Sequence, residues 1–178
     1  MRLAPIVHPK SWFVRIAYWY SRRTFGKVLT TLKVIYARKP AFIRAYLALQ
    51  KTQDRALSLP LSLRLLLKAH IASINGCSFC LDITRYYATA SVLKDKLGAL
   101  PNYKNNPIFT RLECAALAFV EQATRQRIID DAVFTELQEC FNDTEIVELT
   151  WFNATENFLN LTAIPLGIGS DELCAIPH

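Results

Sequence analysis

The stretch LSLRLLLKAHIASINGCSFCLDITRYYA, residues 61–88, predicts two consecutive helices with a sharp turn between them. In its first half, apolar side chains recur at three- and four-residue spacing, which gives a helix a wide apolar face. Gly76 marks the turn, because glycine tolerates the left-handed conformation that a helix end often requires. The second helix is expected to begin near Cys77 and to run through Tyr87 towards Leu93.

Helical patterns continue on both sides of this stretch. Prolines and capping residues precede the apolar segments, and Thr110 with Glu113 has the spacing of a capping box. Gly98, Pro101 and Pro107 predict a loop over residues 97–107. The other helices are expected at about residues 12–21, 27–37, 41–51, 111–124, 131–140 and 144–161. With five glycines and no lasting strand-like alternation, the chain is predicted to be all-α and to form a single domain over residues 1–178.

The composition is that of a globular protein with a sizeable core, since 52% of the residues are hydrophobic and 20% are charged. No apolar run reaches the roughly 18–20 residues that cross a bilayer. The N-terminal MRLAPIVHPK lacks the apolar centre of a secretion signal. We therefore expect a cytoplasmic protein whose cysteines are mostly reduced thiols.

Basic residues gather in the N-terminal part of the chain. Within residues 1–55, Asp54 is the one acidic residue among many lysines and arginines, and aromatic residues are interleaved with them. Such a segment could contact an anionic membrane or a phosphate backbone. The alternative that we favour is packing on the more acidic remainder of the same subunit or of a neighbour. We do not expect a nucleic acid or a membrane surface as a partner.

Cys77-x-x-Cys80 is the motif with the clearest chemical meaning. A spacing of three places both sulfurs on one face of the first turn of the predicted helix. The free N–H groups and the helix dipole at that end stabilise a thiolate, which makes the sulfur nucleophilic. A cytosolic pair with this spacing therefore indicates a redox-active dithiol.

A metal half-site and simple packing are the two alternatives for this pair. A structural zinc site needs four ligands, but the other cysteines and the histidines form no second pair: Cys114, Cys140, Cys174, His8, His70 and His178. We therefore expect no metal, and no motif indicates a cofactor. Cysteine also packs well as a small apolar residue, which accounts for the three isolated cysteines and remains open for Cys77 and Cys80.

Three blocks of the sequence resemble the carboxymuconolactone decarboxylase/alkylhydroperoxidase D-like superfamily. They are residues 61–88, the segment RLECAALAFVEQATRQRIIDDAVFTELQECFNDTEIVELTWFNATENFLN at 111–160, and IPLGIG at 164–169. The N-terminal part is similar to the extension of longer members. The resemblance implies an all-helical bundle with a basic N-terminal helical extension (1–56), a family core (57–170) and a tail (171–178). It also implies a homo-oligomer, either a dimer, a trimer or a hexamer.

The resemblance assigns different roles to the two cysteines. In the cysteine-bearing, peroxidase-type members the second cysteine attacks the peroxide and the first resolves the product as a disulfide. Carried over, Cys80 is the attacking residue and Cys77 the resolving residue. True decarboxylase members do not rely on such a pair, so the pair argues against decarboxylation.

The chain departs from the family pattern where the proton relay would lie. The expected glutamate twelve residues before the first cysteine is Leu65, and the expected histidine four residues after the second is Thr84. Phe79 stands where some members have a histidine between the cysteines, and Leu161 replaces a late arginine.

Three other polar residues near these blocks are candidates to replace the missing proton relay. His70 could serve as a base from two helical turns before Cys77, or it could be a packed, hydrogen-bonded core residue. Asp82 is expected to act as a cap, because an acid in the first turn would raise a thiol pKa. Glu148 could point inward or could stabilise helix packing.

The sequence therefore predicts a thiol–disulfide oxidoreductase or a weak alkylhydroperoxidase-like antioxidant protein. The candidate catalytic residues are Cys77, Cys80 and His70. Its substrate would be a peroxide or a disulfide, and an external dithiol would regenerate the pair. The alternatives are a non-enzymatic or redox-sensing oligomer of the same fold and, less favoured, a decarboxylase-like enzyme.

Overall fold

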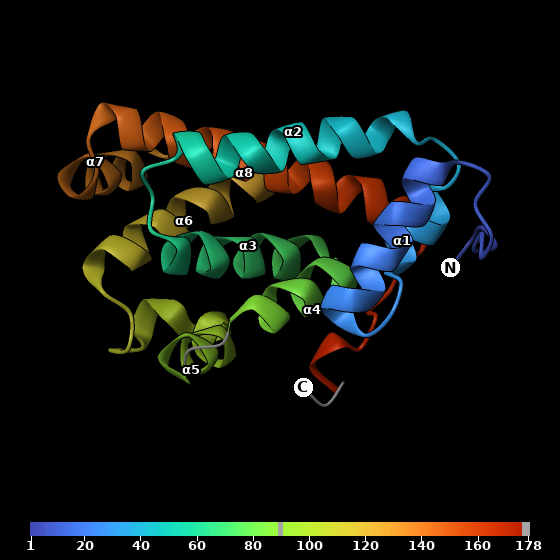
Figure 1. The fold of residues 1–178 in the computed structure, drawn as a ribbon. Coiled ribbons are helices and arrows are strands. Elements are labelled where there is room, and N and C mark those ends of the chain that lie inside the picture. The colour runs from blue at the N-terminus through green and yellow to red at the C-terminus, as the bar shows by residue number, and fades with distance from the viewer. Residues whose placement is uncertain (89–90, 176–178) are drawn as a thin grey trace.

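The computed structural model describes residues 1–88 and 91–175, and every regular element within these ranges is a helix (Figure 1). The predicted all-α class is confirmed. The α-helices are α1 (Trp12–Phe25), α2 (Ala41–Ala56), α3 (Leu61–Asn75), α4 (Ser78–Tyr87), α5 (Ser91–Ala99), α6 (Arg111–Arg125), α7 (Asp131–Cys140) and α8 (Asp143–Ala163). The shorter π and 3-10 segments are η1 (Leu32–Tyr36), η2 (Leu100–Asn105), η3 (Ile164–Leu166) and η4 (Leu173–Ala175).

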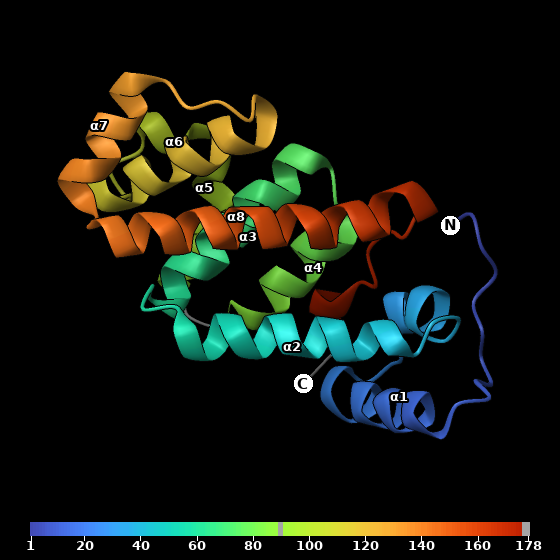
Figure 2. The same cartoon turned by 90° about the horizontal axis from the view of Figure 1, so that it is seen from above.

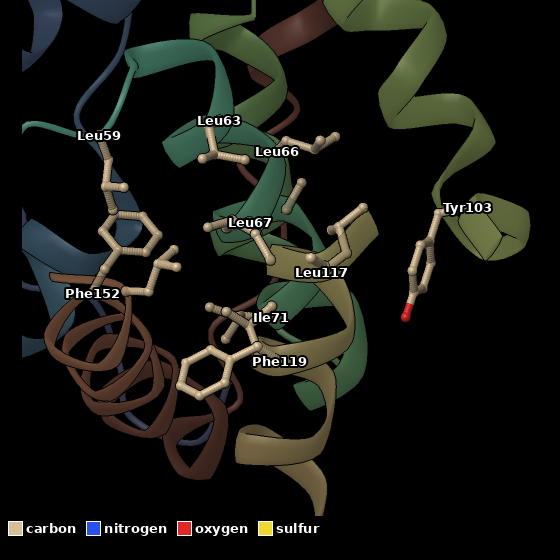
Figure 3. Close-up of a cluster of buried hydrophobic side chains, with 14 of the residues drawn as sticks. Leu59, Leu63, Leu66, Leu67, Ile71, Tyr103, Leu117, Phe119 and Phe152 are labelled. Carbon is tan, nitrogen blue, oxygen red and sulfur yellow. The ribbon is translucent and has the colours of Figure 1, made fainter. Parts of the chain in front are cut away.

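Helix α3 is the central element, and it packs against α4, α6 and α8. Its side chains Leu66, Leu67 and Ile71 are completely buried. They form one apolar cluster with Leu117 of α6 and Phe152 of α8 (Figure 3). Full burial of one such side chain contributes about 1.5–3 kcal/mol to stability. The apolar periodicity of residues 61–75 is therefore what builds the core.

Local sequence signals fix several helix ends. Gly76 ends α3 with a φ of 70°, and the chain turns directly into α4. Thr110 with Glu113 forms a complete capping box at the start of α6, and Asn142 with Glu145 does the same for α8. The predicted turn at Gly76 and the predicted capping box at Thr110 are confirmed.

The prediction of a helix over residues 27–37 is correct only for its second part. Helical structure begins at Thr30, and the Leu32–Tyr36 portion is a π-helix. The preceding residues are held in a non-helical path by the Ser21 hydroxyl. It donates to the Lys27 carbonyl at 2.8 Å and accepts from the Leu29 N–H at 3.0 Å.

The predicted loop over residues 97–107 was also partly wrong. Helix α5 extends to Ala99, and η2 continues with Pro101 in its first turn, where a missing N–H costs little.

Helix α4 ends at Tyr87, short of the predicted extension towards Leu93. Part of that extension, residues 89 and 90, lies outside the described residues.

Helix α2 runs along the side of the bundle opposite α6 and α7, and α1 lies beyond η1 (Figure 2). Both α1 and α2 contact η1. Among the described residues, no helix has both the length and the apolar character that a membrane span requires.

The C-terminal segment ties α4 to the N-terminal part of the chain. The Asp82 carboxylate accepts from the Asp171 N–H at 2.8 Å and from the Leu173 N–H at 3.0 Å. The Asp171 carboxylate in turn accepts from the Thr30 N–H at 2.7 Å and from its hydroxyl at 2.6 Å, and Lys27 donates to the Asp171 carbonyl. The division of the chain at 56 and 170 into extension, core and tail stays a prediction.

Candidate functional site

Cys77 and Cys80 lie at the start of α4, directly after the turn at Gly76, and they form a disulfide. Cys77 is the N-cap residue, and its sulfur accepts from the Cys80 N–H at 3.3 Å. Both residues are buried, in an apolar cluster that includes Phe25 and Leu173. Sulfur chemistry here would therefore take place at a helix N-terminus and away from bulk water.

A cavity of about 680 Å³ lies beside this disulfide, between α1, η1, α2, α3, α4 and α8. Its volume is in the range of sites that bind small organic molecules. Among the described residues, Cys80 is the cysteine that lines it, and Cys77 is not one of the lining residues. Much of the wall is apolar or aromatic, with contributions from Phe13, Phe25, Leu32, Leu65, Phe79, Ile83, Phe152 and Leu159.

The three positions that depart from the family relay are all close to this site. Leu65 and Phe79 line the cavity with apolar side chains. Thr84 is completely buried, and its hydroxyl donates to the Cys80 carbonyl at 2.7 Å. Neither apolar side chain can accept a proton from a thiol, and the Thr84 proton is already engaged by a backbone oxygen.

His70 lies on a different side of α3 from Leu65 and Lys68, which line the cavity. Its Nε2 is 4.0 Å from a Glu121 carboxylate oxygen, and its ring makes an edge contact with Tyr103. Burial lowers the pKa of His70 to about 4. The structure brings Cys77 and Cys80 together but does not bring His70 to the cavity, and its role as a base stays a prediction.

Asp82 and Glu148 both bind backbone N–H groups. The Asp82 carboxylate binds backbone N–H groups of residues 171–173, as described above, rather than a cysteine sulfur. Glu148 accepts from the Ser58 N–H at 2.7 Å, the Ser58 hydroxyl at 3.0 Å and the Leu59 N–H at 3.3 Å. Its carboxylate therefore fastens the α2–α3 connection to α8.

A group of polar residues on the cavity wall was not predicted from the sequence. The Lys68 ammonium is 3.4 Å from a Glu156 carboxylate oxygen, and Arg64 is 3.6 Å from Asp54. Gln53 adds an amide to this group, which we call the polar cluster. A sequence signal did exist, because Glu156 follows Leu149 and Phe152 on the buried side of α8. An acidic residue in such a stripe is uncommon unless it is paired.

Tyrosines near the polar cluster are held in their neutral form. Burial raises the pKa of Tyr46 well above its ordinary value, and the nearby Glu156 carboxylate raises it further. Burial also raises the pKa of Tyr36. Both side chains line the cavity. Because their pKa values are raised, each keeps its hydroxyl proton at physiological pH.

Within the described residues, no three His, Cys, Asp or Glu side chains are grouped to hold a metal ion.

Comparisons with known proteins agree with the fold. No family model matches the chain. The uncharacterized protein YnjA of Escherichia coli K12 is 30% identical over 163 residues, which cover 90% of this chain and 89% of YnjA. A crystal structure from Agrobacterium tumefaciens, described as a candidate antioxidant defence protein AhpD, has 25% identity and a TM-score of 0.68. The likeness covers 77% of this chain and 96% of that one.

A peroxidase-related protein from Silicibacter sp. TM1040 has a more similar fold, with a TM-score of 0.78 at 22% identity. The likeness covers 94% of this chain and 90% of the Silicibacter chain. The helical bundle is the fold of these AhpD-like and peroxidase-related proteins, and in this chain a CxxC pair lies at the start of α4. The chain belongs to the carboxymuconolactone decarboxylase/alkylhydroperoxidase D-like superfamily.

Proposed function

We propose that the protein is a thiol–disulfide oxidoreductase with weak alkylhydroperoxidase-like activity, in which Cys80 attacks the substrate and Cys77 resolves the product. One observation carries this proposal: Cys80 lines the cavity, while Cys77 does not line it but is bonded to Cys80. The CxxC pair and the likeness to AhpD-like proteins support it.

With a peroxide, the reaction consists of two displacements. The Cys80 thiolate attacks one peroxide oxygen, so that an S–O bond forms and the O–O bond breaks. The alkoxide takes up a proton and leaves as an alcohol. The Cys77 thiolate then attacks the sulfenic sulfur, which forms the S–S bond and releases hydroxide, protonated to water. An external dithiol reduces the disulfide and is itself oxidised.

A disulfide substrate would use the same two sulfurs. The Cys80 thiolate forms a mixed disulfide and displaces one thiolate, and Cys77 then displaces the second. The start of α4 supplies the thiolate stabilisation that both reactions need. Because Leu65, Phe79 and Thr84 replace the relay, peroxide reduction lacks base catalysis, which typically contributes about 10²–10⁴-fold. Slow peroxide turnover is therefore expected.

The test is dithiothreitol-dependent consumption of cumene hydroperoxide. Cys80→Ser should reduce the rate to background, and Cys77→Ser should prevent sustained turnover. Cys114→Ser is the matched control, because Cys114 lies on α6 with its sulfur near the Tyr103 carbonyl, and its rate should equal that of the wild type. Sustained turnover by the Cys80→Ser variant would overturn the proposal.

Self-association is a second part of the proposal, supported by an exposed apolar stripe along α8. The stripe consists of Val147, Trp151, Phe158 and Leu161, whose spacing places them on one face of the helix. Contiguous exposed apolar surface of this kind is typical of protein interfaces. A second copy of the chain is the occupant that the family resemblance implies.

A further inference from the structure

We propose that the cavity beside Cys80 binds a neutral, largely apolar organic molecule that donates a hydrogen bond to Glu156. The inference rests on the proposed function and deepens it, because it names the class of substrate that would reach Cys80. It assigns a binding role to the polar cluster, which the thiol chemistry leaves unused.

The Glu156 carboxylate is buried without a hydrogen-bond donor within the described ranges. Glu156 is 1% exposed, and neither of its oxygens accepts a hydrogen bond from any residue that the structure describes. Lys68 lies at 3.4 Å, close enough to balance the charge but without hydrogen-bond geometry. A buried carboxylate with free lone pairs strongly favours a donor, since leaving it unsatisfied is costly.

Gln53 provides a second buried polar group on the same wall. It is 4% exposed, and its Nε2 has no acceptor among the described residues, although its Oε1 accepts from Gln50 at 3.4 Å. A ligand that meets both groups would donate to Glu156 and accept from Gln53. A hydroxyl or an amide can do both.

The balance of charge on the cavity wall favours a neutral ligand. Arg64 and Lys68 are matched by Asp54 and Glu156, in two pairs at 3.6 and 3.4 Å. A ligand anion would be attracted by the basic members and repelled by the acidic ones, with no net gain to offset its desolvation. The remaining lining is mostly apolar and suits an aromatic or aliphatic body.

Helices α3 and α8 run in the same direction beside the cavity. Glu148 binds Ser58 and Leu59, and Asn75 binds Asn157 and Asn160, so α3 and α8 run the same way. Figure 2 shows the same arrangement. Lys68 lies seven residues before Asn75, so the polar cluster is roughly 10 Å along the helix axis from the end of α3, after which the CxxC turn begins. Because Cys80 and Glu156 both line the cavity, one molecule within it could contact both.

The experiment compares three ligands of one skeleton by equilibrium dialysis against the disulfide form of the full chain. The ligands are 2-naphthol, which has a donor, 2-methoxynaphthalene, which has none, and 2-naphthoate, which is an anion. The proposal predicts that 2-naphthol binds about 10- to 100-fold more tightly than either of the others. Because the disulfide form is used, failure of the thiol chemistry would not affect the result.

Glu156→Gln tests the assignment to this residue, and Glu148→Gln on the same helix is the matched control, because it lies outside the cavity. Glu156→Gln should reduce the preference for 2-naphthol over 2-methoxynaphthalene to near unity, while Glu148→Gln should keep it. Equal binding of the two ligands by the wild type, tighter binding of 2-naphthoate, or an unchanged preference in a folded Glu156→Gln variant would overturn the proposal. The wild-type comparison decides the matter even if Glu156→Gln does not fold.

Discussion

Cys77 and Cys80 have the same side chain but different surroundings. Cys77 caps α4, with its sulfur bound by the Cys80 N–H, while Cys80 adjoins the cavity. The turn and the helix start could be anticipated from the sequence, because CxxC after Asn75-Gly76 is a local pattern, whereas the different roles of the two cysteines came only from the family resemblance. The apolar residues packed around the pair could not be anticipated, because Phe25 and Leu173 are distant in the sequence.

The polar cluster illustrates what the sequence could not reveal. Lys68 and Glu156 are 88 residues apart in the chain, and although the position of Glu156 in an apolar stripe suggests that it is paired, the sequence does not identify its partner. Only the packing of α3 against α8 brings them to 3.4 Å. Glu148, which lies in the most recognisable family segment, instead binds the α2–α3 connection.

His70 leads to a prediction about the pH dependence of stability. Burial lowers its pKa from 6.5 to about 4, so the unfolded chain binds a proton more readily than the folded protein does. The contribution of His70 to stability is therefore complete above about pH 6.5 and is lost as the pH falls towards 4. Between about pH 7 and pH 5 the loss should be about 2 kcal/mol.

Urea unfolding of the wild type, His70→Gln and His8→Gln at these two pH values checks this prediction. His70→Gln should lack this part of the pH dependence. His8→Gln should retain it, because His8 is exposed. Identical pH dependence of the wild type and His70→Gln would show that His70 does not titrate as its burial implies.

At the scale of elements, helix ends were predictable where the signal was local. Gly76, the Thr110 capping box and the Asn142 capping box all depend on residues within one turn. The segment after Gly26 was predicted less well, because the Ser21 hydroxyl holds residues 27–29 out of the helix and Thr30 is bound by Asp171, which is distant in the sequence. The cavity escaped prediction for a similar reason, since it depends on how α2 lies relative to α3 and α8.

The C-terminal segment should be released when Asp82 is replaced. Asp82→Ala removes the acceptor of the Asp171 and Leu173 N–H groups, and hydrogen bonds to a charged acceptor contribute about 1.5–3 kcal/mol. We expect faster amide hydrogen exchange at residues 171–173 and at Thr30. Asp95→Ala on α5 is the control, because Asp95 is exposed. Unchanged exchange in Asp82→Ala would mean that other contacts hold the segment.

At the scale of the molecule, the bundle keeps an apolar stripe on the outer face of α8. Val147 and Leu161, near its two ends, are 67% and 60% exposed. In sedimentation velocity, the wild type should behave as an oligomer, and Trp151→Glu should shift it towards the monomer. Trp12→Glu should not, because Trp12 is exposed on α1 and not on the stripe. A monomeric wild type, or an oligomer that Trp151→Glu leaves intact, would contradict the proposed interface.

The measurement that tests the central claim most directly is mass spectrometry of the reduced protein after one equivalent of cumene hydroperoxide. We predict a Cys77–Cys80 disulfide in the wild type, a sulfenic acid on Cys80 in Cys77→Ser, and no oxidation of Cys77 in Cys80→Ser. These results follow from Cys80 alone lining the cavity among the described cysteines. Oxidation of Cys77 in Cys80→Ser, or two intact thiols in the wild type, would contradict the account.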